Sequence, residues 1–181
     1  MARLALVPHV GLPLLIAAAL AAAPAHLPAQ TPAPAGPQEA PPQEAGVVGL
    51  FLDSASLQPT VVLRGKRDRR SFGMAIGAAE ATGIVYPLEN RVPPRPLTHD
   101  LFLTLFGRLK VVVTRVVITD LKDGIYYATV FLDAGGKEMQ LDARPSDAIA
   151  LAIRAKVPVL VEDRVFDKSE LLPGPHPAPR I

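Results

Sequence analysis

A unit of three short β-rich runs followed by a helical run occurs twice along this chain, and this repetition constrains the fold more than any other feature. The two copies lie 67 residues apart, so that Glu80 falls on Asp147. Apolar positions in the runs before each helix also coincide, with Phe72 falling on Met139. The pattern predicts an α+β domain in which helices pack against mostly antiparallel sheets, built from a duplicated three-strand-plus-helix unit.

Residue patterns place the elements of each copy. Strands are expected where apolar and polar residues alternate or β-branched residues run together, and helices where apolar residues recur every three or four positions. The expected strands and helix of the first copy are residues 47–53, 59–64, 71–76 and 78–85. Those of the second copy are residues 110–120, 125–132, 137–143 and 145–155, and a buried strand at 157–161 closes the domain.

A further helix is expected between the copies, after a loop at residues 87–96 that contains four prolines. Thr98 has a side chain suited to capping the first turn, and the helical pattern runs to about Arg108. Its apolar residues recur on one face, so we expect this face to be buried. The expected buried stripe consists of Phe102, Leu105, Phe106 and Leu109.

The start of the chain has the features of a secretory signal peptide at residues 1–29. A weakly positive start is followed by an apolar run from Leu12 to Ala23 and by small residues that allow cleavage after Ala25 or Ala29. The run is shorter than a membrane span, so no stable span is expected after cleavage. The predicted location is therefore periplasmic or extracellular. The alternatives are an uncleaved anchor, or a misassigned start ahead of a cytoplasmic protein.

Residues 30–45 are rich in Pro and Ala and predict a disordered linker. Residues 173–181 predict a disordered tail, which leaves 46–172 as the globular domain.

Composition excludes several classes of site. The chain has no cysteine, which excludes disulfides, thiolate metal sites and cysteine nucleophiles. Its formal net charge of +2 is too small to indicate a polyanion-binding protein by itself. There is no glycine-rich phosphate loop, and no organic cofactor is expected.

Polar residues are concentrated where the expected strand at 137–143 runs into the helix at 145–155. Asp142 and Asp147 flank this corner, and their carboxylates are candidate ligands for Mg²⁺ or Mn²⁺. Such an ion activates water against a phosphodiester, and Arg144 is placed to bind a phosphate oxygen. In the structural interpretation, Arg144 instead bridges both acids as a clamp at the helix start. Spacing alone favours the clamp.

A second polar group opens the helix that follows the proline-rich loop. An imidazole can accept or donate a proton near neutral pH, so His99 is a candidate general acid or base, and Asp100 beside it is a third candidate metal ligand. The alternative is an acid that favours its helix start and a histidine bonded to a loop carbonyl, which spacing alone again favours. Glu80 occupies the place of Asp147 in the first copy, where a purely structural role is favoured more clearly.

A dense basic run lies in the turn between two strands of the first copy. Its side chains are candidates for salt-sensitive contacts with nucleic-acid phosphates, and a solvated turn is the alternative. No aromatic residues interleave with them, so base stacking is not indicated there. The run consists of Arg64, Lys66, Arg67, Arg69 and Arg70.

Residues 95–101 (RPLTHDL) and 142–152 (DARPSDAIALA) resemble the two signatures of the bifunctional nuclease domain family, and residues 76–81 (IGAAEA) match a third, weaker one. The resemblance covers about Val47 to Leu171. It implies an α+β fold with a duplicated unit, a homo-oligomer, and activity on both DNA and RNA. The predicted function is a nuclease that hydrolyses their phosphodiester bonds. The alternative is a non-catalytic binding or assembly module whose polar motifs are structural.

Overall fold

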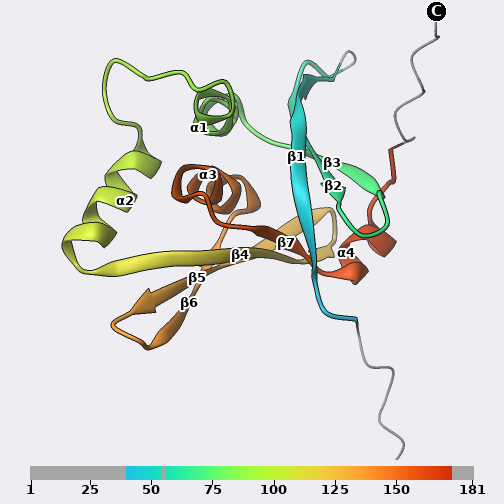
Figure 1. Cartoon of the computed structure of the whole chain (residues 1–181). Coiled ribbons are helices and arrows are strands. Elements are labelled where there is room, and N and C mark those ends of the chain that lie inside the picture. Colours follow the sequence, from blue (N-terminus) through green and yellow to red (C-terminus); the bar gives the residue numbers. More distant parts are fainter. Residues whose placement is uncertain (1–39, 54–55, 173–181) are drawn as a thin grey trace, which may run out of the picture. The chain divides into compact units, whose positions relative to one another are not determined.

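The computed structural model describes residues 40–53 and 56–172, which form seven strands and four helices (Figure 1). The strands are β1 (Gln43–Leu52), β2 (Pro59–Gly65), β3 (Ser71–Ala75), β4 (Val111–Lys122), β5 (Ile125–Ala134), β6 (Glu138–Ala143) and β7 (Val159–Val161). The helices are α1 (Ala78–Leu88), α2 (Thr98–Arg108), α3 (Pro145–Ala155) and α4 (Asp163–Lys168). The predicted signal peptide and C-terminal tail lie outside the described residues.

The described strands form one mixed sheet in the order β3-β2-β1-β7-β4-β5-β6. Strands β1 to β3 are an antiparallel meander followed by α1, and β4 to β6 are a second meander followed by α3. Strand β7 joins the meanders, because it pairs antiparallel with β1 and parallel with β4. The predicted α+β class is confirmed, whereas descent of the two meanders from one duplicated unit stays a prediction.

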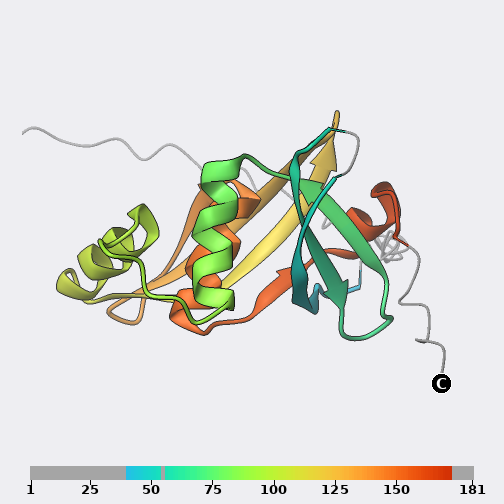
Figure 2. The same cartoon turned by 90° about the horizontal axis from the view of Figure 1, so that it is seen from above.

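Helix α3 forms where the sequence predicted it, from Pro145 to Ala155. Proline suits the first helical position because its missing N–H needs no partner there. The middle of α3 is buried from Ala148 to Ala152, and three of its residues are alanines that allow close packing against α1 and the sheet. Figure 2 shows α1 and α3 together over the sheet, with α2 apart from them at one end.

Helix α1 continues through Pro87 to Leu88, although the proline predicted an earlier end. Pro87 has no N–H to donate to the carbonyl of Gly83 four residues before it. Arg154 of α3 supplies this bond, since its Nη1 donates to the Gly83 carbonyl oxygen. The same guanidinium donates to Asp100 Oδ1 of α2 at 2.8 Å and to the carbonyl of Ala150 at 3.0 Å. Arg154 therefore joins α1, α2 and α3.

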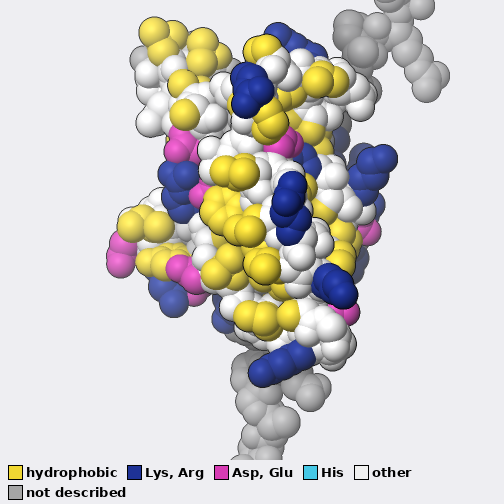
Figure 3. Space-filling view, turned by 90° about the vertical axis from the view of Figure 1, so that its left-hand side faces the viewer, with side chains coloured by type: hydrophobic (Ala, Val, Ile, Leu, Met, Phe, Trp, Pro, Cys, Tyr) yellow, Lys and Arg dark blue, Asp and Glu magenta, His cyan; other side chains and the backbone are white. Residues whose placement is uncertain are grey.

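The predicted burial of the α2 stripe is wrong for Phe102, Leu105 and Leu109, whereas Phe106 is partly buried against the core. None of the residues of α2, all of which the structure describes, is buried, and Phe102 and Leu105 are 45% and 47% exposed. Leu109, directly after the helix, is 63% exposed. Periodicity identifies which face of a helix is apolar, but not whether the same chain covers that face. Figure 3, which faces this side, shows hydrophobic side chains gathered between separate Lys and Arg side chains.

The cap of α2 also differs from the prediction. The N-cap residue is Leu97 rather than Thr98, and the Leu97 N–H donates to Asp100 Oδ2 at 2.8 Å. An acid in the first turn thus replaces the expected hydroxyl cap. This bond fixes the carboxylate of Asp100, whose other oxygen accepts from Arg154.

Two further elements differ from the predicted boundaries. Strand β1 begins at Gln43, inside the predicted linker, because the Gln43 side chain is buried and donates to Asp68 and Asp163. Helix α4 was not predicted, since its six residues are too short for a helical period. It buries Val165 and Phe166. No helix among the described residues has the length and apolar content needed to cross a membrane.

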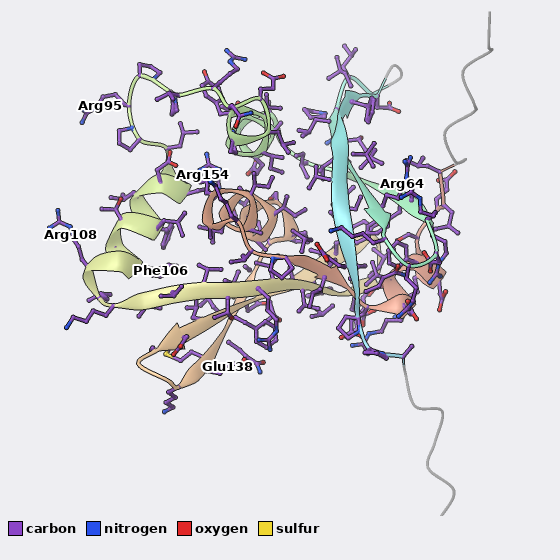
Figure 4. All side chains as sticks on the ribbon, viewed as in Figure 1. Arg64, Arg95, Phe106, Arg108, Glu138 and Arg154 are labelled. Carbon is purple, nitrogen blue, oxygen red and sulfur yellow. The ribbon has the colours of Figure 1, made fainter. Side chains whose placement is uncertain are left out.

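We predict that Arg154→Met destabilises the fold by about 3 kcal/mol, because it leaves Asp100 and the Gly83 carbonyl without their charged donor. The Arg154 side chain is only 7% exposed. Arg108→Met on α2 is the control, since Arg108 points outward from the helix (Figure 4) and should change stability by less than about 0.5 kcal/mol. Urea unfolding followed by circular dichroism measures both, and equal midpoints would contradict the prediction.

Candidate functional site

The first turns of α1, α2 and α3 meet around a small hollow of about 160 Å³. Each helix contributes at least one polar side chain, and Arg144 precedes α3 as its N-cap residue. Because the N-terminus of a helix carries a partial positive charge and free N–H groups, three such ends favour negative groups. We call the side chains that meet here the helix-start cluster: Glu80, His99, Arg144 and Asp147.

Arg144 lies between the two acids of this cluster. Its Nη1 donates to Glu80 Oε1 at 2.7 Å, and its Nε donates to Asp147 Oδ2 at 2.7 Å. These hydrogen bonds, first to Asp147 and then to Glu80, raise the pKa of Arg144 above its ordinary value, so the group is always charged. The Arg144 side chain is nevertheless 64% exposed. The clamp considered from the sequence therefore forms, but it links Asp147 to Glu80 rather than to Asp142.

Asp147 is held from its other side by His99. The distance from His99 Nε2 to Asp147 Oδ1 is 3.2 Å. Burial alone would raise the pKa of Asp147, but hydrogen bonds from Arg144 and His99 outweigh burial and hold the pKa below its ordinary value. Asp147 is thus a fixed, ionised carboxylate at neutral pH.

Neither ring nitrogen of His99 is freely exposed to solvent. Nε2 is engaged with Asp147, and Nδ1 is buried without a hydrogen-bond partner among the described residues. A ring that carries a proton on Nε2 donates it to Asp147, while Nδ1 has no partner to bind in the described part of the chain. This geometry favours a role for His99 in positioning Asp147 over the predicted role in proton transfer.

Gly83 allows the His99 ring to lie close to α1. A Cβ built on Gly83 would lie 2.7 Å from His99 Cε1 and 3.0 Å from Nδ1, so only glycine lets the ring approach α1 this closely. The roles of Gly83 and Arg154 in supporting the site were not predicted from the sequence. A glycine inside a helical pattern, and an arginine inside an apolar helix, are the signals that point to such roles.

The three predicted metal ligands do not converge. Asp100 is turned to Arg154 and the Leu97 N–H, and Asp147 to Arg144 and His99. Asp142, near the end of β6, is not among the described residues that line the hollow of the helix-start cluster. Among residues 40–53 and 56–172, no group of three or more His, Asp or Glu side chains is placed to hold a metal ion. The Arg144 guanidinium already lies between Glu80 and Asp147, where a bridging cation would bind.

The predicted nucleic-acid contacts lie elsewhere. The basic turn between β2 and β3 contacts β1 and α4, and Figure 4 shows Arg64 on the other side of β1 from Arg154. Ion pairs join Arg67 to Asp163 and Arg70 to Asp68, both within 2.7 Å. Further partners of this turn include Glu44 for Lys66, Ser71 for Arg64, Asp163 and Asp167 for Arg70, and Gln43 and the Pro41 carbonyl for Arg67. Phosphate contacts by these side chains stay a prediction, and most would require these bonds to be exchanged.

A larger hollow continues from the helix-start cluster between α2 and β6. This α2–β6 groove has a volume of about 490 Å³. Its polar end contains Thr98, His99, Asp142, Arg144 and Asp147, and its apolar lining is Phe102, Phe106, Val130, Leu141, Ala143 and Leu151. A further hollow of about 360 Å³ lies on the other side of Arg144 and includes Tyr126 and Ser146. Arg144 borders all three hollows.

Residues 61–173 match the family model of the bifunctional nuclease domain. The matched range includes the whole helix-start cluster. The chain belongs to the bifunctional nuclease domain family. Two proteins of Mycobacterium tuberculosis, from strains CDC 1551 / Oshkosh and H37Rv, are each 37% identical to it over 129 residues. That alignment covers 71% of this chain and 77% of each relative, and both relatives are uncharacterized.

A plant relative carries the name of an activity. Bifunctional nuclease 1 of Oryza sativa subsp. japonica is 36% identical to this chain over 81 residues. The alignment covers 43% of this chain but only 24% of the rice protein. The nuclease name therefore belongs to a much longer protein, of which this chain matches one part.

We predict that Gly83→Ala displaces the His99 ring from Asp147 while the fold persists. The added Cβ meets a side chain that can rotate away, and alanine gains up to about 1 kcal/mol of helix propensity. The matched control is Gly107→Ala, because a Cβ on Gly107 meets no described atom within 4 Å. NMR of the His99 ring should report a changed environment only in Gly83→Ala. An unchanged His99 spectrum would contradict the predicted contact.

The acids of the site also predict a pH dependence of stability. Burial alone would raise the pKa of Asp100, but hydrogen bonds from Arg154 and the Leu97 N–H outweigh burial and lower the pKa below its ordinary value. Hydrogen bonds from Arg144 and His99 have the same effect on Asp147. Because the folded pKa lies below the unfolded value, this stabilisation is present above about pH 4 and is lost as pH falls through the folded pKa. Melting temperatures should fall steeply below about pH 4, and less steeply in Asp100→Asn. Equal slopes in the two proteins would refute this.

Proposed function

We propose that this domain is a nuclease that hydrolyses phosphodiester bonds of DNA and RNA at the helix-start cluster. Family membership supports the reaction class. The single observation that carries the location is the exposed Arg144 guanidinium at the meeting point of three helix N-termini. Both guanidinium groups and helix N-termini bind phosphate oxygens.

The cluster supplies distinct groups for such a reaction. Arg144 binds the scissile phosphate and stabilises the charge that develops on it. The first N–H groups of α3 add to this field, since the described residues offer α3 no side-chain cap. Asp147, ionised and held by His99, orients the attacking water, while Glu80 keeps the guanidinium in place before substrate binds.

Mg²⁺ or Mn²⁺ assistance is part of this proposal, and the ion would arrive bound to the phosphates of the substrate. Mg²⁺ is commonly bound by one or two carboxylates together with phosphate oxygens and water, and so does not require a complete protein cage. This route is consistent with the lack of a three-ligand group among the described residues. Assays with each ion and with EDTA measure the requirement directly.

A non-catalytic assembly module is the second candidate, and two observations favour it. The charged side chains of the cluster already have protein partners, as expected of a structural clamp. The exposed apolar face of α2 resembles a surface that a second subunit covers. A homo-oligomer is compatible with either function, and export of the chain stays a prediction from residues 1–29.

We predict that Asp147→Asn lowers kcat/KM on single-stranded DNA and on RNA by at least about 100-fold, because it removes the charge that orients water. Its free energy of unfolding should change by less than about 1 kcal/mol, since the ion pair is partly exposed. Asp163→Asn is the matched control. Asp163 also lies in a first helical turn and pairs with Arg67, but belongs to α4.

The two candidate functions give different outcomes in this experiment. A nuclease retains activity in Asp163→Asn and loses it in Asp147→Asn, with both proteins folded. An assembly module shows no cleavage by the wild-type chain with either metal ion, and Asp147→Asn lowers its melting temperature. Full activity in a folded Asp147→Asn protein would remove the helix-start cluster from the proposed chemistry.

A further inference from the structure

The α2–β6 groove is open, partly aromatic, and continuous with the helix-start cluster. Its volume of about 490 Å³ lies within the range of pockets that bind small molecules, about 300–1,000 Å³. By contrast, the hollow at the cluster itself, about 160 Å³, has room for little more than a phosphate group and water. The groove therefore offers the space that the cluster lacks.

The groove has an apolar floor and an aromatic wall. The floor is the helix-facing side of β5 and β6, where Val130 pairs with Leu141 in adjacent strands. Phe102 and Phe106 of α2 form the wall, and Figure 4 shows Phe106 between α2 and the sheet. Phe102 and Leu141 are each 45% exposed, so a planar apolar ligand would gain by covering them.

The polar end of the groove indicates which polar groups such a ligand has. Arg144 stands at this end, and its exposed guanidinium suits an anionic oxygen, while Thr98 offers a hydroxyl. A ligand that fits both ends is a flat ring joined to a phosphate, which is the chemistry of a nucleotide. Stacking on an aromatic side chain accepts any base, because every base has a π-face.

We propose that the α2–β6 groove is a nucleobase subsite, in which a base lies against Phe102 while its phosphate binds Arg144. This inference rests on the proposed function and deepens it, because it defines the substrate class. A base in a duplex has both faces covered by its neighbours and cannot lie against Phe102 unless it is unstacked. The preferred substrate is therefore single-stranded nucleic acid or an unpaired nucleotide within a duplex.

The test compares two exposed apolar residues of the same helix. Phe102→Leu keeps an apolar side chain but removes the ring, and Phe102→Tyr keeps the ring. Leu105→Ala is the control, because Leu105 is 47% exposed, close to the 45% of Phe102, but lies outside the described lining of the groove. Fluorescence anisotropy in EDTA measures binding of a labelled single-stranded oligonucleotide to the full chain. Initial rates with Mg²⁺ or Mn²⁺ measure cleavage of the same strand and of its duplex.

Binding to single strands should weaken about 10-fold or more in Phe102→Leu, and remain near wild type in Phe102→Tyr and Leu105→Ala. The wild-type chain should also cleave the single strand faster than the duplex. If the wild-type chain cleaves and Phe102→Leu binds and cleaves as well as it does, the subsite is overturned while the proposed function stands. If the wild-type chain does not cleave, the proposed function fails, and selective loss of binding in Phe102→Leu still supports the subsite.

A second copy of the chain is the competing occupant of the groove. Light scattering on the same variants tests for it. Dissociation of an oligomer by both Phe102→Leu and Leu105→Ala, with equal loss of binding, would identify the groove as a subunit contact and overturn the subsite. An unchanged oligomeric state in Phe102→Leu, together with weakened binding, supports it.

Discussion

The insertion of β7 between the two meanders is the constraint on which the rest of the structure depends. This strand has three residues, yet it supplies the hydrogen bonds that join β1 to β4, and its Val159 and Val161 are buried between the two halves. Because α3 leads directly into β7, the position of the strand fixes where the helix lies. The start of α3 is thereby placed against α1, which belongs to the first meander, and against α2, which connects the meanders.

Two arginines of the α3 segment hold the neighbouring helices, and their exposure separates their roles. Arg154 is 7% exposed and completes the hydrogen bonding of α1 where Pro87 cannot, so the loss of its bonds would leave buried groups unsatisfied. Arg144 is 64% exposed, and its ion pairs are screened by water. An exposed guanidinium exchanges one carboxylate for a phosphate at little cost. The buried arginine is therefore suited to structure and the exposed one to binding.

Local patterns in the sequence predict most elements but not the contacts that create the site. Alternation in β3 placed Phe72 and Met74 correctly on one buried face, and Pro145 marked the start of α3. The approach of His99 to Gly83 could not be predicted, because it depends on how two helices pack. The predicted burial of α2 was wrong for a related reason. An apolar stripe shows which face of a helix would gain from burial, but only the tertiary structure shows whether another element covers that face. The pairing of Arg144 with Glu80 joins residues 64 positions apart, beyond the reach of spacing arguments.

The site belongs to neither meander alone. Glu80 comes from the first three-strand-plus-helix unit, Asp147 from the second, and His99 from the helix between them. Glu80 and Asp147 occupy equivalent positions in their units, yet both bind the same arginine. Only the second unit has Arg144, since the corresponding position of the first is Gly77. One guanidinium shared by two acids gives this junction a single exposed cationic group, so any chemistry here has one centre rather than two.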